Sequence, residues 1–352
     1  MEEKRMKKAI EWNDLSRYRG ELMGIAMLFI ILFHVYLPRQ HAFFGLHRLG
    51  NVGVDMFFFL SGIGLWYSWT KPLEKGMSLR KTLASPLISF YKKRYWRIYP
   101  AWLVIASLYY IPIYCKSKTQ TLIDLIGDIS INWDFWIRDE LTFWYIPAIM
   151  MLYMIAPFYM ELIRRHPVYR WLAVAMVCWC VIVQWVTPVH QAVGHIEIFW
   201  SRVPIFLIGL NVGELVKNRQ SLDSSSLWLL LLMFALPFAG SLYLEQMVHG
   251  KFPLFAERML YIPMTVSGTL LLCLLLKKVP SWLNSSLSFI GGISLEIYLI
   301  HAHFVLNHIQ KQHLGYWPTF FLTVIATIPL AWLLSKATEW LRIWAGVERK
   351  KK

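Results

Sequence analysis

Long apolar runs separated by short polar connections dominate the sequence between residues 21 and 341. A helix needs roughly 20 apolar residues to cross the hydrocarbon core of a bilayer, and ten segments of this chain approach that length. The Gly and Pro residues within them are tolerated in a bundle, because neighbouring helices satisfy the freed backbone groups. The pattern therefore predicts an all-α membrane protein, a bundle of about ten transmembrane helices. The predicted spans are 21–38, 51–69, 97–115, 142–162, 169–187, 199–216, 227–246, 258–276, 287–308 and 318–341.

The distribution of Lys and Arg residues predicts the orientation of this bundle. Of 36 such residues, 25 fall in the two ends of the chain and in the connections on their side, and 9 fall in the opposite connections. Cytoplasmic connections carry an excess of positive charge, so both termini are expected in the cytoplasm. The chain then consists of a basic N-terminal segment (1–20), a membrane domain (21–341) and a basic tail (342–352).

Composition supports this class and excludes others. Apolar residues make up 57% of the 352 residues and charged residues 16%, whereas soluble domains have roughly 45–50% and about 25%. Such high hydrophobicity excludes a disordered chain. The net charge of +15 would suggest nucleic acid binding in a soluble protein, but its one-sided distribution explains it without such a partner. The Cys and His spacings indicate no metal site, so we expect none.

Two titratable residues in the first two predicted spans point to function, because such groups are costly in lipid. His34 follows Glu21 by about 13 residues, which places it roughly 20 Å into the first span. Asp55 lies near the outer end of the second span, which the short connection makes an antiparallel neighbour of the first. A carboxylate bound to one ring nitrogen would leave the other nitrogen as a base. Alternatively, His34 is a hydrogen-bonded core residue and Asp55 complements its helix dipole.

Basic residues gather where the third span would leave the cytoplasm, in the sequence KKRYWRIYP. Arg94 and Arg97 are three residues apart and share one helix face, with Lys93 directly before them. Guanidinium groups suit bidentate binding of phosphate. The alternative is an ordinary topology signal at a cytoplasmic helix end.

Other polar and aromatic residues within spans indicate a polar cavity. Glu296 and His301 both fall in the ninth span, although five residues is not an ideal spacing for one helix face. Trp144 and Tyr153 lie in the fourth span, where they are candidates for an acceptor site or for interfacial belt positions. Arg202 opens the sixth span at the outer face, where a long basic side chain can reach the interface.

Three function classes agree with these features: a membrane enzyme, a transporter and a structural membrane partner. The sequence contains no GxSxG, GxxxxGK[ST] or HExxH motif, so no soluble catalytic fold is indicated. A transporter or flippase of a lipid-linked or small polar substrate would also place Arg, Asp, Glu and His in its spans, but no inverted repeat is visible. A purely structural membrane partner would leave His34 and Asp55 unexplained.

Five sequence blocks, in this order, resemble acyltransferase family 3, the bacterial integral-membrane acyltransferases that modify surface polysaccharides. The resemblance runs through most of the chain. The blocks are ELMGIAMLFIILFH at 21–34, GVDMFFFLSG at 53–62, KKRYWRIYP at 92–100, WYIPAIMMLYMIAP at 144–157 and ISLEIYLIHAHF at 293–304.

The resemblance implies an O-acetyltransferase of the bacterial inner membrane. Its donor would be cytoplasmic acetyl-CoA, or another acyl-CoA, and its acceptor a hydroxyl group of a cell-surface or lipid-linked glycan. His34 matches the catalytic histidine of the family and Asp55 its acidic position. Arg94 and Arg97 match an Arg-x-x-Arg pair proposed to contact the donor.

This chain departs from the family pattern at two places. Many members have Arg or Lys eleven positions before the histidine, where this sequence has Met23. Many also have Glu in the Trp-led block, where residues 148–151 read AIMM. A basic group near His34 must therefore come from elsewhere, for which Arg202 is a candidate, or be absent.

Overall fold

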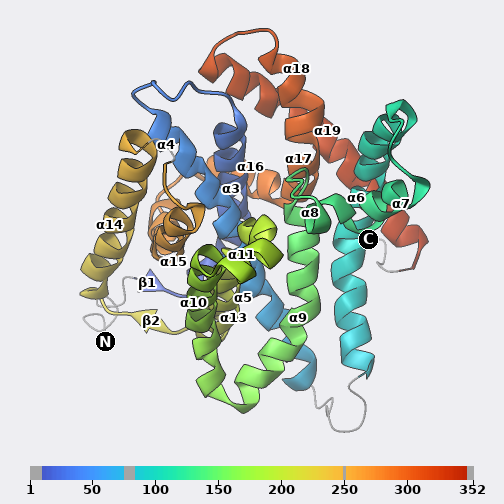
Figure 1. Cartoon of the computed structure of the whole chain (residues 1–352). Helices are drawn as coiled ribbons and strands as arrows, with labels where there is room; N and C mark the ends of the chain where they lie inside the picture. The colour runs from blue at the N-terminus through green and yellow to red at the C-terminus, as the bar shows by residue number, and fades with distance from the viewer. Residues whose placement is uncertain (1–9, 75–83, 249–250, 347–352) are drawn as a thin grey trace.

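The computed structural model describes residues 10–74, 84–248 and 251–346, and in these ranges the protein is almost entirely helical (Figure 1). The basic residues expected in 1–9, 75–83 and 347–352 lie outside the described residues. The elements, in chain order, are β1 (Ile10–Glu11), α2 (Asp14–Arg17), α3 (Arg19–His34), α4 (Phe44–Arg48), η1 (Leu49–Asn51), α5 (Val52–Glu74), α6 (Ala84–Lys116), α7 (Leu122–Ile131), α8 (Trp133–Ile137), α9 (Tyr145–Arg165), η2 (Pro167–Trp171), α10 (Leu172–Trp185), α11 (Thr187–Val193), η3 (Gly194–Ile196), α12 (Glu197–Trp200), α13 (Val203–Lys217), β2 (Ser221–Leu222), α14 (Ser226–Met247), α15 (Leu254–Leu276), α16 (Ser281–Gly292), α17 (Ser294–Ile300), η4 (His301–Leu306), α18 (Asn307–Gln310) and α19 (Tyr316–Trp344).

Each predicted span coincides with a helix or with a pair of consecutive helices. In the described ranges, seven helices are long and apolar enough to cross a bilayer, and two bent pairs would raise that number to nine. The first predicted span forms α3, whose 16 residues cover about 24 Å and fall short of a usual span. The protein is thus a multi-pass helical membrane protein, and the count of ten stays a prediction.

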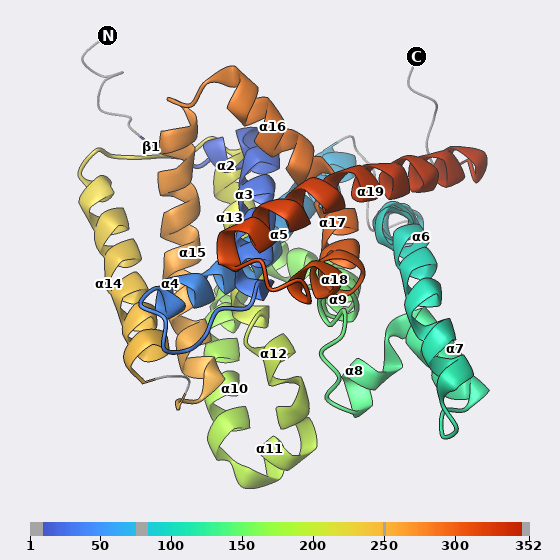
Figure 2. The ribbon, with the colours of Figure 1, turned by 90° about the horizontal axis from the view of Figure 1, so that it is seen from above.

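Helices α3 and α5 run through the interior, with α14 at one edge of the bundle and α6 and α7 at the opposite edge (Figures 1 and 2). The apolar stretch of the span that contains α5 is 89% buried inside the protein, whereas the apolar stretch of α14 is 11% buried. Exposed Trp, Leu and Ile side chains cover the outer helices, as expected for contact with lipid. The small antiparallel ladder of β1 and β2 pairs Ile10 with Leu222.

Close contact between helices depends on glycine at a few positions. A Cβ atom on Gly24 of α3 would lie 2.1 Å from the carbonyl oxygen of Leu287 on α16. On α5, a Cβ on Gly62 would lie 2.6 Å from the carbonyl oxygen of Phe206 on α13. Both distances are too short for any other residue without movement of a backbone, so glycine lets these interior helices touch.

The ninth predicted span is broken in two. Helices α16 and α17 meet at an angle of 62°, directly after Gly291 and Gly292. Gly291 packs on the backbone of Gly20, and α17 continues into a π-helical turn at His301–Leu306. Turns of this kind widen the helix and occur often at functional sites. Helix α19 then runs along the side of the molecule toward α6 (Figure 2).

The connection between the third and fourth predicted spans contains two helices that the apolar pattern did not predict. Thr121 and Asp124 form a capping box at the start of α7, which satisfies otherwise unpaired backbone groups. Arg138 then forms ion pairs with Asp124 and Asp134, at 2.9 and 3.1 Å. This hairpin extends the edge formed by α6.

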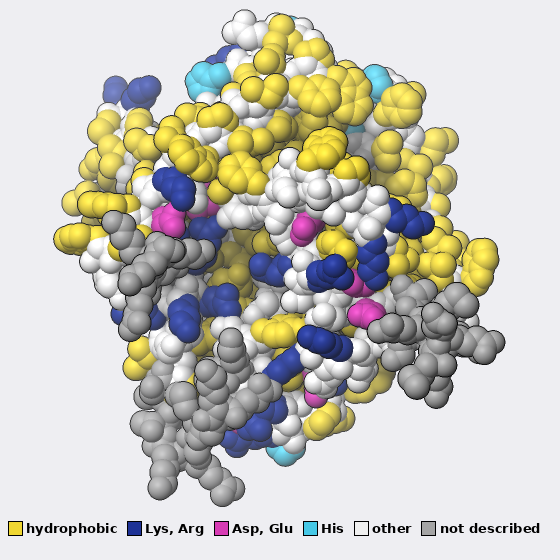
Figure 3. All heavy atoms as spheres, turned by 180° about the vertical axis from the view of Figure 1, so that it is seen from behind, with side chains coloured by type: hydrophobic (Ala, Val, Ile, Leu, Met, Phe, Trp, Pro, Cys, Tyr) yellow, Lys and Arg dark blue, Asp and Glu magenta, His cyan; other side chains and the backbone are white. Residues whose placement is uncertain are grey.

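The distribution of charge on the surface is uneven. Lys and Arg side chains gather in the middle and lower part of the face shown in Figure 3, and hydrophobic side chains cover its upper part. A one-sided distribution of this kind is what the predicted orientation requires.

Cysteine labelling tests the orientation. After Cys115 and Cys178, which are exposed, are replaced by serine, Lys311→Cys should react with an impermeant thiol reagent in intact cells. Lys278→Cys should react only after permeabilisation, because the charge distribution places Lys278 in the cytoplasm. Both lysines are exposed, so each position serves as the control for the other. Labelling in the reverse pattern would invert the orientation.

Candidate active site

His34 is the last residue of α3, and its ring lies beside that of His301 at the start of the π-helical turn. The two ring centroids are 4.9 Å apart in an edge-to-face arrangement. His34 Nδ1 lies 2.8 Å from the carbonyl oxygen of Ile30 and 3.4 Å from His301 Nε2. The His34 side chain is exposed, whereas that of His301 is 1% exposed. A buried histidine thus supports an accessible one.

The hydrogen bonds assign the protons of both rings. His301 Nδ1 lies 2.8 Å from the carbonyl oxygen of Tyr298 and 3.0 Å from that of Ile297. A carbonyl oxygen only accepts, so Nδ1 of a neutral His301 carries the proton and Nε2 is an acceptor. The same reasoning places the proton of His34 on Nδ1, facing Ile30 and His301. His34 Nε2 is then left unprotonated and can act as a base or as a nucleophile.

Asp55 does not bind His34, which corrects the expected pairing. Its carboxylate lies 3.6 Å from Arg202 Nε, and both side chains are fully buried. Within the described residues, no hydrogen bond or ion pair joins Asp55 to His34. Asp55 lies on α5, which packs against α3 through Gly53. The Asp55 side chain, however, points toward Arg202 at the start of α13. The expectation of similar depth did not account for the rotation of α5, which turns Asp55 away from His34.

The predicted position of Arg202 also differs from the observed one. It was expected to reach the outer interface or to assist His34, but it is 0% exposed and lies between Asp55 and Trp144. Its guanidinium carbon is 5.5 Å from the centroid of the Trp144 ring, within the range of a cation–π contact. An unpaired charge would be very costly at this position, so the Asp55 carboxylate and the indole ring explain why the arginine is buried there.

The predicted phosphate-binding arginines lie toward the other end of α3. Arg97 donates to the Glu296 carboxylate at 2.7 Å and to the carbonyl oxygen of Gly292 at 2.9 Å. Arg94 packs over the ring of Phe90, and its buried Nε has no hydrogen-bond partner among the described residues. Lys93 is exposed at the same end of α6. Arg94 and Arg97 both lie near Arg19 of α3.

Arg19 is a third member of this cluster that sequence reasoning missed. It is half-buried, lies close enough to Arg94 and Arg97 to interact electrostatically, and contacts the carbonyl oxygen of Leu60 at 3.4 Å. Gly64 of α5 lies within van der Waals contact of the Arg19 guanidinium, since a Cβ there would be 3.5 Å from Arg19 Nε. Arg19 precedes Met23 by one helical turn, and this spacing was the signal in the sequence.

Glu296 and His301 belong to different parts of the site. Glu296 binds Arg97, whereas His301 contacts His34. A separation of five residues on a helix points the two side chains in different directions. Glu296 thus connects α17 to α6, whereas His301 contacts the last residue of α3.

Aromatic side chains lie between the two ends of α3. The hydroxyl oxygen of Tyr298 accepts a hydrogen bond from the backbone N–H of Tyr145, at 3.3 Å. Trp144 contacts Phe58, with ring centroids 6.3 Å apart. Tyr153 lies near Arg19. Trp144 and Tyr153 are both half-buried, and each contacts side chains of the bundle interior.

A histidine that can act as a base and a group of arginines lie at opposite ends of α3. A ring nitrogen free to accept a proton lies at one end of α3, and Arg19 lies at the other, about 22 Å away along the helix axis, with Arg94 and Arg97 of α6 near Arg19. Comparison of the chain with protein families gives one result that agrees with this arrangement. The model of the acyltransferase family 3, described as an acyltransferase domain, matches residues 22–336.

The chain belongs to acyltransferase family 3.

Comparison with curated proteins and with solved structures gives no significant match. The family assignment establishes this protein as a membrane acyltransferase. In this acyltransferase, the matched region contains His34, His301 and two of the three clustered arginines, Arg94 and Arg97, whereas Arg19 lies three residues before it.

Proposed function

We propose that this acyltransferase moves an acetyl group, or another acyl group, from cytoplasmic acyl-CoA to a hydroxyl group of a cell-surface or lipid-linked glycan. Its location would be the inner membrane of a bacterium. The observation that carries the proposal is the arrangement on α3, in which His34 Nε2 is free to accept a proton at one end and arginines converge at the other.

The donor end suits a molecule with several phosphates. Charge-assisted hydrogen bonds from guanidinium to phosphate are stronger than neutral ones. Arg94 has an unpartnered Nε, and Arg97 is 39% exposed in its side chain despite its ion pair with Glu296. With the phosphates bound there, the long pantetheine arm of coenzyme A would carry the thioester along α3 toward His34.

The acyl transfer then needs a base for a weak hydroxyl nucleophile. His34 Nε2 takes the hydroxyl proton while the oxygen attacks the thioester carbonyl carbon, so a C–O bond forms and the C–S bond breaks. The imidazolium returns that proton to the departing thiolate, which leaves as the free thiol of coenzyme A. The alternative is attack by Nε2 itself on the thioester carbonyl carbon, which breaks the C–S bond, releases the thiolate of coenzyme A and gives an acyl-histidine. The glycan hydroxyl then attacks the acyl carbon and breaks the C–N bond, and its proton ends on the thiolate. In both routes His301 keeps the reactive nitrogen unprotonated by accepting from Nδ1.

The proposed function is tested by the products. Purified protein in vesicles should release the thiol of coenzyme A from acetyl-CoA only when an acceptor glycan is present. Surface glycans from cells with and without the gene should differ in ester-linked acetyl groups. Equal ester content in both strains, together with no thiol release, would reject the proposal.

Arg94 should contribute to donor affinity. Replacement by methionine keeps its packing on Phe90 and removes the charge, and a hydrogen bond to a charged group is worth about 1.5–3 kcal/mol. Arg94→Met should therefore raise KM for acetyl-CoA about tenfold or more. Arg138→Met, in the ion-paired hairpin of α7 and α8, is the matched control and should leave KM unchanged. An unchanged KM in folded Arg94→Met protein would contradict a role in donor binding and would leave Arg94 as an ordinary topology signal.

A further inference from the structure

Two polar side chains close to the base have no hydrogen-bond partner. His303, in the π-helical turn, packs its ring against that of Tyr109 on α6, with centroids 4.9 Å apart. Both side chains are half-buried, and His303 lies near His34. Within the described residues, no hydrogen bond joins a ring nitrogen of His303 or the hydroxyl group of Tyr109 to another group. Unpaired polar groups inside a membrane domain are costly, so this pair is available to a ligand.

Phe143 holds these two side chains in place. Its ring centroid lies 4.7 Å from that of His303 and 5.2 Å from that of Tyr109, and it is 3% exposed. Phe143 has a φ of 54°, a left-handed conformation that a bulky residue rarely adopts. Asn132 fixes the same loop by donating to the carbonyl oxygen of Thr142 at 2.7 Å. Strained backbone of this kind persists where the surroundings enforce it, and it occurs often at ligand sites.

The pair of Tyr109 and His303 lies at the same end of the bundle as the base. Tyr109 lies about 22 Å beyond Arg94 along α6. His34 lies at the same distance from Arg19 along α3. The pair is therefore remote from the arginines and close to His34, where an acceptor must bind.

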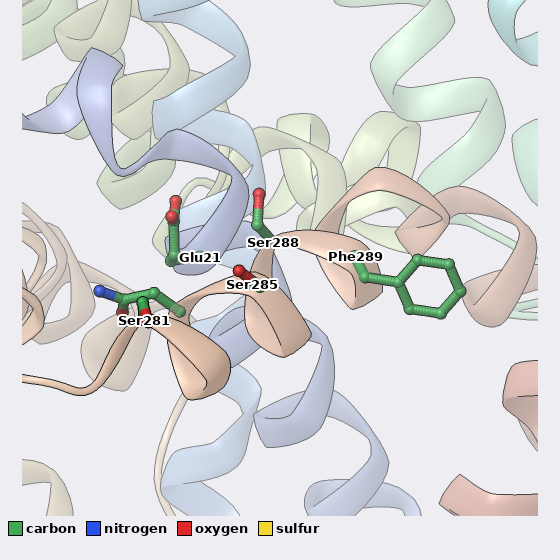
Figure 4. Close-up of a pocket in the computed structure, with 6 residues that line it drawn as sticks. Glu21, Ser281, Ser285, Ser288 and Phe289 are labelled. Atoms are coloured by element: carbon green, nitrogen blue, oxygen red, sulfur yellow. The ribbon is translucent and has the colours of Figure 1, made fainter.

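A second region of the protein offers hydroxyl and carboxylate groups, but at the wrong end of α3. An open hollow of about 560 Å³ is lined by Glu21 of α3 and by Ser281, Ser285 and Ser288 of α16 (Figure 4). Glu21 is about 20 Å from His34 along the helix axis. A sugar bound in this hollow could not present a hydroxyl group to His34 Nε2, so the acceptor needs a site nearer to the base.

We propose that Tyr109 and His303 bind a sugar ring of the acceptor glycan next to His34. This inference rests on the proposed function and adds the place of the acceptor. A sugar ring has apolar C–H faces, which pack on an aromatic ring such as that of Tyr109. It also has hydroxyl groups, for which the tyrosine hydroxyl and the imidazole supply both donors and acceptors. His303 positions the acceptor, and His34 takes its proton.

Two variants that keep their rings test the proposal. Tyr109→Phe removes one hydroxyl group, and His303→Phe keeps a ring beside Phe143 but removes both nitrogens. The acceptor is the unacetylated surface glycan, purified from cells that lack the gene. Each variant should raise KM for this glycan about two- to tenfold, the value of one hydrogen bond. The KM for acetyl-CoA should stay unchanged, as should binding of S-ethyl-CoA, a donor analogue that lacks only the carbonyl oxygen.

The matched control is Tyr114→Phe, also half-buried on α6, which should change neither KM. A wild-type KM for the glycan in both folded variants would overturn the proposal, and so would an equal rise of both KM values. If His303→Phe does not fold, Tyr109→Phe decides the question, because it removes a single oxygen atom. Absence of acetyl transfer to the glycan by the wild-type protein would instead reject the proposed function.

Discussion

Replacement of His34 by alanine should abolish acyl transfer while the protein still folds. A general base contributes roughly 10²–10⁴-fold to a rate, and loss of a covalent acyl carrier would be more complete. Because the His34 side chain is exposed and ends its helix, removal of the ring should disturb little packing. The measurement is thiol release from acetyl-CoA by purified protein whose elution in size-exclusion chromatography matches the wild type.

Two further variants give this prediction its controls. His308→Ala, at an exposed position on α18, should retain full activity. His301→Ala should lower kcat with little change of KM, because His301 positions the His34 ring and does not contact the donor phosphates. Near-normal transfer by His34→Ala would show that the site is wrong even though the family is established. His301 would then be the next candidate for the base.

Asp55→Asn should strongly destabilise the protein. Arg202 is fully buried and lies 3.6 Å from the Asp55 carboxylate, so the variant leaves a buried cation without its counter-charge. Breaking a buried ion pair in this way costs about 3–5 kcal/mol. Thermal unfolding in detergent should report a large decrease in midpoint relative to the wild type.

The double variant Asp55→Asn with Arg202→Gln separates stability from catalysis. Because both charges are removed, much of the lost stability should return. Recovery of folding together with acyl transfer would assign Asp55 a structural role. Wild-type stability of Asp55→Asn combined with loss of transfer would contradict this interpretation and place Asp55 in the chemistry.

The sequence predicted where helices lie better than which side chains meet. Apolar runs of about 20 residues located every long helix, because length and hydrophobicity are properties of a segment. The partner of His34 depends on how helices rotate about their axes, which the runs do not encode. Asp55 was expected there from its depth alone, whereas the observed partner, His301, is 267 residues away in sequence.

Other features required signals of a different kind. Helix α7 begins with a Thr-x-x-Asp capping box, which a search for helix starts would have found where hydropathy found only a connection. Arg19 was overlooked because the family pattern places a basic residue at position 23, one turn later on the same face. The break after Gly292 is marked by two adjacent glycines, but its 62° angle depends on the packing of Gly291 against Gly20.

The backbone contacts between α3 and α16 hold α3 in a fixed position in the bundle. Gly20 and Gly24 bring the two helices so close that neither can slide without a clash, and α3 carries Arg19 at its first residue and His34 at its last. The distance between Arg19 and His34 is therefore set by the length of one helix rather than by a mobile loop. For the proposed donor, a thioester on a shorter arm would not reach His34 from the arginines, whereas a longer acyl chain would only extend beyond the ring.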